Sequence, residues 1–510
     1  MKNLLRTCFA ALLAALRLCQ PVAVLAAGEL PPDSKPDVRF GAVEAWMEPA
    51  AAEALRVGWD RLLIDWYKYQ PEAPEEWVPS ADDDARVNTA LAAGREMVLL
   101  LRGTPAWATD GAARASPPRG LHLPVAANSN LWANFVHRVM KHYKGRVSRY
   151  IIWNEPDIAV GDGGAQFNGS IEQYYRMVKI AWLVAREVDP QAKIHLAGLT
   201  YWHDAVNGRT PFLERYLALV ARDSSARANN FYFDAATLHI YFRPQSVFDL
   251  IALHRKFLHQ YGLAQPIWLN ETNAAPFDDA LLPWPNPFVY VTMEQQGAFV
   301  IQAFALALAA GAERAAVYKF AEVSGSLPGF DYYGLYRTDM TARPAVESLR
   351  AVTTHFAGVL TTSYVMRASH YIVRLDRGGL VTRVLRRPCS TINLAGAAGS
   401  CWRTATAPTS WRCPARIAAA RAPTVWWVVR HFCWWRKCGA CRRRSTRCRT
   451  HCAALAQRRC AGSRLQAGNQ LRGLRINCCA SRCCGALQPA GVPSITLNTQ
   501  CGKRRQEQRL

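Results

Sequence analysis

The sequence predicts an α/β protein built on a (β/α)8 barrel, followed by the start of a small C-terminal β-sandwich and an anomalous, disordered Cys/Arg-rich tail. Three observations support this prediction. Short apolar runs alternate with longer amphipathic stretches over residues 38–345, which is typical of βα repeats around a parallel sheet. Eight such runs fall within about 280 residues, the usual number and size for this barrel. Basic residues and cysteines are concentrated after residue 388.

Each predicted strand is one of the short apolar runs. The eight ranges are Val38–Ala45, Arg61–Trp66, Glu96–Leu101, Val147–Trp153, Ile194–Leu199, Ala235–Tyr241, Pro266–Asn270 and Ala315–Phe320. Helices are expected between them, for example at Asn130–Tyr143, Ile171–Val188, Phe212–Arg222 and Phe248–Tyr261. An open doubly wound sheet is the alternative, but such sheets usually carry a glycine-rich phosphate loop after the first strand. Here the first strand ends in Glu44-Ala45-Trp46, which favours the barrel.

Residues 1–27 are typical of a secretory signal. Lys2 and Arg6 precede an apolar stretch, and small residues around Ala26 offer a cleavage site. The stretch is too short for a confident membrane-spanning helix, and Arg17 interrupts it. Residues 20–388 contain no cysteine, which suits an exported protein that avoids stray disulfides. We therefore expect a periplasmic or extracellular protein with no membrane span in the mature chain.

The net charge of +24 suggests nucleic-acid binding, but its distribution argues against this function. Residues 389–510 carry 22 Lys and Arg against a single acidic residue, Glu507. Residues 1–388 carry 40 basic and 37 acidic residues and are therefore nearly neutral. We expect no nucleic-acid partner for the barrel.

Two glutamates stand where the fourth and seventh strands end. Glu155 follows Trp153-Asn154, and Glu271 follows Asn270. Barrel enzymes place their catalytic groups at the C-terminal ends of the strands, and strands 4 and 7 lie across the mouth from one another. Both carboxylates are therefore expected to face one cleft.

Two opposed carboxylates are what retaining glycoside hydrolysis requires, because one protonates the leaving group and the other attacks the anomeric carbon. Like charge and partial burial would drive their pKa values apart and so assign these roles. His203 and Asp204 follow strand 5, but two adjacent side chains without a further partner do not make a metal site. We expect no catalytic metal and no cofactor.

Tryptophans at the strand ends are candidates for stacking on sugar rings. Trp107 and Trp202, just past strands 3 and 5, are the better candidates, and Trp66 is another. Because tryptophan is largely buried on average, packing in the core is the alternative for each ring.

Ile151-Ile152-Trp153-Asn154-Glu155-Pro156 resembles the acid/base motif of the clan A glycoside hydrolases, which are (β/α)8 barrels with catalytic glutamates after strands 4 and 7. Other segments resemble the same clan, most closely families 39 and 5. They are Arg61 through Trp66 to Gln70-Pro71, Thr104-Pro105-Ala106-Trp107-Ala108, and His239-Ile240-Tyr241.

The resemblance implies that Glu155 is the acid/base, that Glu271 is the nucleophile, and that Asn154 holds the sugar 2-hydroxyl. In the clan, the tyrosine that matches Tyr241 usually supports the nucleophile. Together with the motifs and the strand-end tryptophans, this gives one set of candidate substrate-binding residues: Asn154, Tyr241, His239, Arg61, Trp66, Trp107 and Trp202.

One departure from the clan pattern concerns strand 8. The clan usually has a tryptophan there as a floor for the sugar ring, whereas this chain reads Val317-Tyr318-Lys319-Phe320. Either Tyr318 or Phe320 takes its place, or the floor of the site differs.

The function predicted from these features is a secreted retaining β-glycoside hydrolase that cleaves O-glycosidic bonds of an oligo- or polysaccharide by double displacement. The alternative is a non-catalytic glycan-binding protein on the same barrel. In both cases the partner is a saccharide.

Residues 346–387 are expected to form a partial β-sandwich after the last helix of the barrel, which begins near Leu349, since Tyr371–Asp376 alternates and Gly378-Gly379 turns. Residues 388–510 contain no Asp and no Tyr but 14 Cys and six Trp. A disulfide scaffold, a zinc module and a basic nucleic-acid-binding tail all fit this composition poorly. A frameshift fits better, because one back-translation of Ser400–Ala407 read from its third base gives Leu-Leu-Ala-Asp-Arg-Tyr-Gly. We therefore expect the tail to be unstructured.

Overall fold

The computed structural model describes residues 35–285, 287, 289–323, 332–367, 370–378 and 380–386, together with the backbone of 424–429. The predicted signal at 1–27 lies outside these residues. So does the predicted unstructured tail at 388–510, apart from that one short backbone stretch. Both remain predictions.

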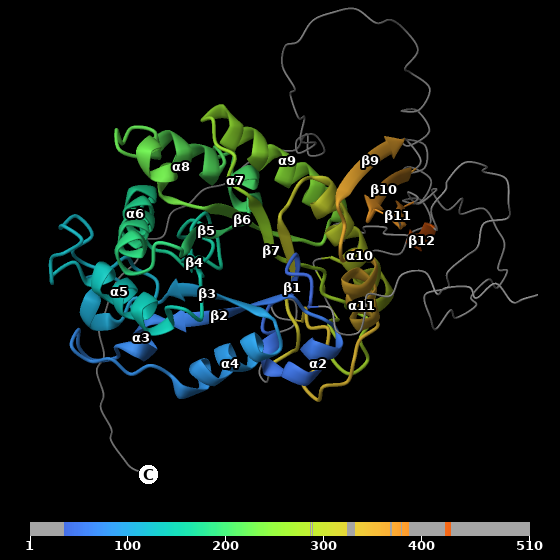
Figure 1. Cartoon of the computed structure of the whole chain (residues 1–510), viewed down its shortest axis with the longest axis horizontal. Helices are drawn as coiled ribbons and strands as arrows, with labels where there is room; N and C mark the ends of the chain where they lie inside the picture. Colours follow the sequence, from blue (N-terminus) through green and yellow to red (C-terminus); the bar gives the residue numbers. More distant parts are fainter. Residues whose placement is uncertain are drawn as a thin grey trace, which may run out of the picture. The chain divides into compact units, whose positions relative to one another are not determined.

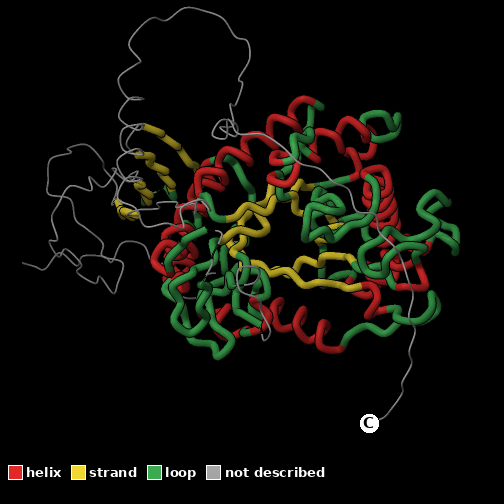
Figure 2. The backbone as a smooth tube through the Cα atoms, turned by 180° about the vertical axis from the view of Figure 1, so that it is seen from behind, coloured by secondary structure: helices red, strands yellow, loops and turns green. Residues whose placement is uncertain are grey.

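Eight parallel strands close into a barrel, which confirms the predicted fold class. Figures 1 and 2 show the strands as an inner wall with the helices outside it. The strands are β1 Phe40–Ala42, β2 Trp59–Asp65, β3 Glu96–Arg102, β4 Arg149–Ile152, β5 Lys193–Leu199, β6 Ala235–Tyr241, β7 Ile267–Asn273 and β8 Arg314–Val317. Strand β1 pairs with both β2 and β8, which closes the ring.

Helices and short turns connect the strands. The α-helices are α2 Pro49–Ala54, α3 Trp66–Tyr69, α4 Ala81–Ala92, α5 Leu131–Tyr143, α6 Ile171–Val188, α7 Trp202–Val206, α8 Phe212–Val220, α9 Pro244–Gln260, α10 Met293–Ala309 and α11 Ala345–His355. The 3-10 turns are η1 Ala45–Met47, η2 Ala106–Ala108 and η3 Arg227–Tyr232. Among the described residues, no helix combines the length and the apolar character needed to cross a bilayer.

Local sequence explains where the long helices begin. Ser170 caps α6 by accepting from the Gln173 amide, and the Gln173 side chain accepts from the Ser170 amide in return. Thr292 and Gln295 form the same reciprocal cap at the start of α10. Such caps satisfy amides that the first helical turn leaves without partners.

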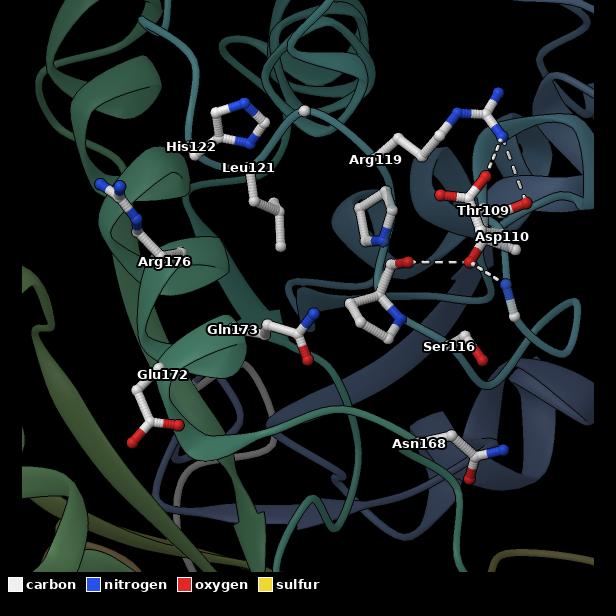
Figure 3. A pocket seen from close by; sticks show the side chains of 14 residues that line it. Thr109, Asp110, Ser116, Arg119, Leu121, His122, Asn168, Glu172, Gln173 and Arg176 are labelled. Atoms are coloured by element: carbon white, nitrogen blue, oxygen red, sulfur yellow. Dashed lines mark hydrogen bonds and ion pairs between the residues drawn. The ribbon is translucent and has the colours of Figure 1, made fainter.

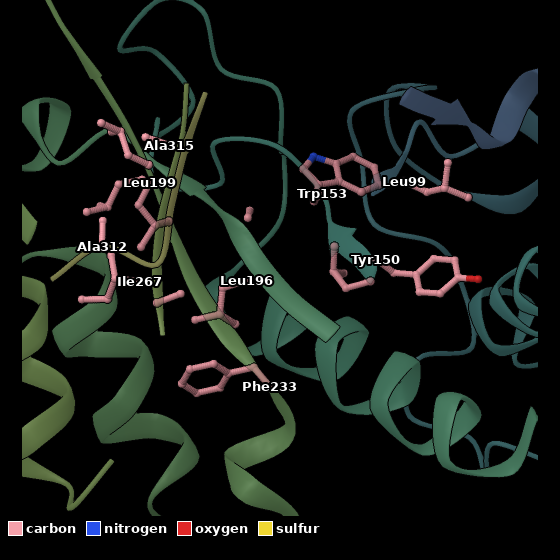
Figure 4. Packing of buried hydrophobic residues seen from close by; sticks show 14 of the residues in the cluster. Leu99, Tyr150, Trp153, Leu196, Leu199, Phe233, Ile267, Ala312 and Ala315 are labelled. Carbon is pink, nitrogen blue, oxygen red and sulfur yellow. The ribbon is translucent and has the colours of Figure 1, made fainter. Parts of the chain in front are cut away.

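Alternation along the strands separates two apolar layers, because successive side chains of a strand point to opposite faces. Trp59, Val98, Leu100, Ile151 and Trp268 fill the barrel interior. Residues at the intervening positions form a larger layer under the helices, part of which is shown in Figure 4. The interior layer lies below the mouth, so it supports the side chains at the strand ends.

Strand pairing is irregular near the mouth. The register shifts between His195 and Gly198 in the β5–β6 pair and between Leu238 and His239 in the β6–β7 pair. Such irregularities re-aim side chains and are common next to active sites.

A small sheet follows the barrel. Strands β9 Thr361–Arg367, β10 His370–Asp376 and β11 Val381–Arg386 pair antiparallel, and β12 Thr424–Val429 pairs parallel with β11. Tyr371 of β10 donates to Gln302 of α10 at 2.9 Å, and Tyr364 of β9 stacks on Phe248 of α9. Helix α11 runs to His355 and precedes these strands, as the expected last helix of the barrel does.

Candidate active site

The two glutamates lie at the same end of the barrel. Glu155 lies in the turn after β4, just beyond Trp153 and Asn154, and has a left-handed backbone, with φ of 45°. Glu271 lies inside β7, which continues to Asn273, so the strand does not end before this residue as expected. In the β6–β7 ladder Glu271 pairs with His239. Glu271 is therefore held within a strand, next to the register shift of the β6–β7 pair, and a turn holds Glu155.

Glu271 is buried among three hydrogen-bonding side chains. Arg61 contacts its Oε1 at 2.5 Å, and the hydroxyl of Tyr241 donates to its Oε2. The imidazole Nδ1 of His239 lies 3.4 Å from the same Oε2. Burial alone would raise the pKa of Glu271, but the charges of His239 and Arg61 and the hydrogen bonds outweigh burial and lower it. Glu271 is therefore held as a carboxylate.

Arg61 was expected to bind substrate, but the structure assigns it a different position. Its side chain is buried, with 4% exposed, and forms an ion pair with Glu271. Burial would lower the pKa of Arg61, but the charge of Glu271 outweighs it and raises that pKa. Arg61 therefore acts on the carboxylate rather than on a sugar.

His239 lies between the two glutamates. Its Nδ1 is 2.6 Å from Oε1 of Glu155, and its side chain is fully buried. The space for the ring exists because residue 198 is glycine: a Cβ added there would lie 1.9 Å from His239 Nε2. His239 was expected to bind substrate, but its contacts are with both carboxylates.

The second oxygen of Glu155 contacts Gln166, a residue that the sequence analysis did not identify. Gln166 Nε2 donates to Glu155 Oε2 at 3.1 Å, and Gln166 Oε1 accepts from Asn154 Nδ2 at 3.2 Å. Asn154 is buried, and its Oδ1 has no hydrogen-bond partner among the residues that the structure describes. That oxygen remains available as an acceptor.

Asp157 ties the loop after β4 to the loop after β5. Its Oδ2 accepts from the Thr200 amide at 2.8 Å, the Thr200 hydroxyl at 2.9 Å and the Tyr201 amide at 3.0 Å. Burial raises the pKa of Asp157 to about 6, although the hydrogen bonds from Thr200 and Tyr201 oppose this shift. Asp157 therefore anchors the turn that carries Glu155.

Glu155, His239 and Glu271 also form a group that could hold a metal ion, since one ligand atom of each lies within 4.8 Å of the others. The guanidinium of Arg61, which contacts Glu271, opposes a further cation at this position. The described residues therefore favour a pair of carboxylates held by hydrogen bonds over a metal centre.

The sequence matches no known family model. No curated protein matches it. Among solved structures, the fold is similar to a family 39 glycoside hydrolase from the gut symbiont Bacteroides cellulosilyticus WH2, with a TM-score of 0.51 and 14% identity over 68% of this chain and 70% of that one. The two proteins share the (β/α)8 barrel fold.

Two further structures are similar at lower scores. A glucosidase from Croceicoccus marinus gives a TM-score of 0.47 and 15% identity, covering 64% of this chain and 70% of that one. A monomeric β-xylosidase from Caulobacter crescentus CB15 gives a TM-score of 0.47 and 13% identity, covering 68% of this chain and 74% of that one. These likenesses concern the fold, and the chemistry depends on the residues described above.

Strand 8 is where the sequence departs from the pattern of that clan, and the structure distinguishes the two candidate rings. Phe320 is fully buried and packs against Tyr336. Tyr318 is half-buried, and its ring lies edge-on to that of Tyr241, with centroids 6.1 Å apart. Tyr318 is therefore the ring that lies beside the glutamates.

The three candidate tryptophans occupy different environments. Trp66 is fully buried and stacks on Phe135 at 4.7 Å, so its assignment as a sugar-binding residue is wrong. Trp107 is half-buried and donates to the carbonyl of Gln70 at 2.8 Å. Trp202 is 39% exposed and is the ring most open to solvent.

A cavity of about 670 Å³ lies between the loop after β3 and the start of α6, and neither glutamate lines it. Figure 3 shows its charged wall, where Arg119 pairs with Asp110 at 2.9 Å. Arg176 and Glu172 add one charge of each sign on α6. Since these charges balance, and the geometry suited to catalysis lies elsewhere, the cavity is not the candidate active site.

Proposed function

We propose that this protein is a retaining β-glycoside hydrolase that acts on an oligo- or polysaccharide. The observation that carries the proposal is the pairing of Glu155 and Glu271 at one barrel mouth, with one oxygen of each carboxylate within 4.8 Å of the other. Retaining enzymes keep their two carboxyl groups about 5–5.5 Å apart, whereas inverting enzymes need about 6.5–9.5 Å to admit a water. The short separation supports retention.

The environments of the two glutamates support distinct roles, with Glu271 as the nucleophile and Glu155 as the acid/base. Glu271 accepts hydrogen bonds from Arg61 and Tyr241, and its lowered pKa keeps it ionised and able to attack. Glu155 is the more exposed of the two, with 14% of its side chain accessible against 7% for Glu271. A group that exchanges a proton with the leaving group and then with water needs that access.

The reaction proceeds in two displacements. Glu155 gives its proton to the glycosidic oxygen while Glu271 attacks the anomeric carbon, so the C–O bond breaks and the sugar becomes an ester of Glu271. Glu155, now a carboxylate, takes a proton from a water that attacks the same carbon and releases Glu271. Asn154 Oδ1, which has no hydrogen-bond partner in the described part of the chain, suits a sugar hydroxyl in this arrangement.

The test is a screen of the purified protein against aryl β-glycosides and bacterial exopolysaccharides. We expect turnover by the wild type, none by Glu271→Ala, and residual turnover by Glu155→Ala when the leaving group is activated. Added azide should restore the activity of Glu155→Ala and yield a β-glycosyl azide, in which the configuration of the substrate is retained. Glu187→Ala, an exposed glutamate of α6, is the matched control and should retain full activity.

Two results would contradict the proposal. An α-glycosyl azide formed by Glu155→Ala would show that the roles assigned to the two glutamates are reversed. Saccharide binding without turnover by the wild type would instead favour a glycan-binding protein on the same barrel.

We also infer export to the periplasm or the extracellular space. The support is the charge, apolar and small-residue pattern of residues 1–27. N-terminal sequencing of the protein recovered from the periplasm or the medium tests this inference, and a chain that keeps these residues in the cytoplasm would contradict it.

A further inference from the structure

We propose that Gln166 is a positioning residue for Glu155, and that its side-chain amide holds the carboxyl group of Glu155 in the orientation needed to protonate the leaving group. This inference rests on the proposed function, because it requires Glu155 to be the general acid. Gln166 is half-buried and lies in the segment between β4 and α6.

A contact with an obligate donor fixes the orientation of the Gln166 amide. Its Oε1 accepts from Asn154 Nδ2 and from Arg102 Nη1, each at 3.2 Å. A guanidinium can only donate, so the group that faces it must be the amide oxygen. The Nε2 group is then turned toward Glu155 Oε2, which it meets at 3.1 Å.

The backbone around Gln166 is held as well. Its carbonyl accepts from the indole Nε1 of Trp153 at 2.9 Å, and the ring of the next residue, Phe167, packs edge-on against the same indole. The Asn168 amide donates to Ala115 at 2.9 Å. Gln166 is therefore bound to the strand end that carries Asn154 and Glu155, although it lies 11 residues beyond Glu155 in the chain.

Arg102 connects this arrangement to the barrel wall. Asp65 and Arg102 are paired neighbours at the ends of β2 and β3, and Arg102 Nε donates to Asp65 Oδ1 at 2.9 Å. Burial would raise the pKa of Asp65, but Arg102 and Lys68 outweigh it and lower that pKa, so the ion pair is charged. A cation on the amide oxygen polarises the amide and strengthens its N–H as a donor.

The consequence concerns the direction of the Glu155 carboxyl group. His239 contacts one of its oxygens and Gln166 the other, so both ends of the group are held. Without Gln166, rotation about the last side-chain torsion of Glu155 is restrained at one oxygen only. Misplacement of a reacting group by about 1 Å costs about 10²-fold in rate.

The experiment compares substrates that need the acid with substrates that do not. Gln166→Met keeps the side-chain length and removes the donor. Because kcat/KM reports only the steps up to departure of the leaving group, we measure it for β-glycosides with leaving groups from 2,4-dinitrophenol to simple alcohols. We expect a loss of about 10²-fold for alkyl glycosides and less than about 3-fold for the dinitrophenyl glycoside, since general acid catalysis contributes about 10²–10⁴-fold. A loss of packing alone would lower both equally.

Two further variants complete the test. Gln166→Glu has the same size but places a like charge beside Glu155, and it should show a larger loss above neutral pH that partly recovers in acid. It also tests the inference if Gln166→Met does not fold. Gln191→Met is the matched control, because Gln191 is exposed and donates to Asp189 through its backbone amide.

Equal losses on all substrates, or no loss, in a folded Gln166 variant would overturn the inference. If Glu155→Ala loses more activity on alkyl glycosides than on the dinitrophenyl glycoside and Gln166→Met does not, only the positioning role of Gln166 is refuted. If the wild type hydrolyses no glycoside, or Glu155→Ala is indifferent to the leaving group, the proposed function itself fails.

Discussion

Replacing Gly198 by alanine should uncouple the two glutamates without altering either of them. The new Cβ would lie 1.9 Å from Nε2, 2.2 Å from Cδ2 and 2.6 Å from Cε1 of His239. Since ordinary contacts begin near 3.4 Å, the ring or the strand must move by about 1.5 Å. The ring is fully buried and its Nδ1 is only 2.6 Å from Glu155, so a shift of this size cannot keep the present contacts with both carboxylates.

The expected cost has two parts. Overpacking a filled interior destabilises a protein by about 1–3 kcal/mol. Misplacement of His239 and Glu155 should lower kcat/KM on aryl β-glycosides by about 10²-fold or more. We would measure kcat/KM together with thermal unfolding, so that lost activity can be separated from lost fold.

Gly297→Ala is the matched control, because a Cβ on that helical residue would meet only the flexible end of Ser348 below 3 Å. It should keep both activity and stability. If Gly198→Ala keeps wild-type kcat/KM, the position of His239 between the glutamates is not needed, and the reasoning about this contact is wrong.

Four other substitutions test the site and its surroundings. Tyr241→Phe removes the hydroxyl that donates to Glu271, and kcat/KM should fall by about 10²-fold while the melting temperature changes little. Asp157→Asn tests pH dependence: the pKa of Asp157 is raised to about 6 from 3.8, so its contribution to stability is fully present below pH 3.8 and is lost as the pH rises through 6. The variant should therefore flatten the unfolding free energy between about pH 4 and 7, by at most about 3 kcal/mol, in denaturant titrations. An unchanged slope would contradict this. Trp66→Ala should lower the free energy of unfolding by about 3–5 kcal/mol, because the ring is fully buried. Trp202→Ala should change KM for oligosaccharides and leave stability unchanged, because that ring is exposed. A stable Trp66→Ala and an unstable Trp202→Ala would contradict both placements.

Much of the barrel could be predicted because periodicity along the chain reports which side chains are buried. Ala235–Tyr241 and Ile171–Val188 match the expected strand and helix at both ends. The glutamates could be located because each follows an apolar run, and a parallel barrel brings the ends of its strands together.

Other features depend on contacts between segments that sequence reasoning does not pair. Strand β7 continues through Glu271 to Asn273 because its polar end still pairs with the ends of β6 and β8, which an apolar run does not reveal. Trp66 is buried because its ring stacks on Phe135 of α5, a helix that lies far from it in the sequence. Gln166 belongs to no periodic pattern, and only its folded neighbours show its connection to Glu155.

The filled interior below the mouth has a consequence for how reagents reach Glu271. Trp59 and Trp268 pack with ring centroids 5.1 Å apart, and the side chains around them are buried, so this part of the barrel is plugged. An electrophilic sugar analogue that esterifies Glu271 must therefore arrive by the route that the saccharide itself uses. Saturating substrate should then protect the protein completely against such a label, and the rate of labelling should fall in proportion to the fraction of unoccupied sites.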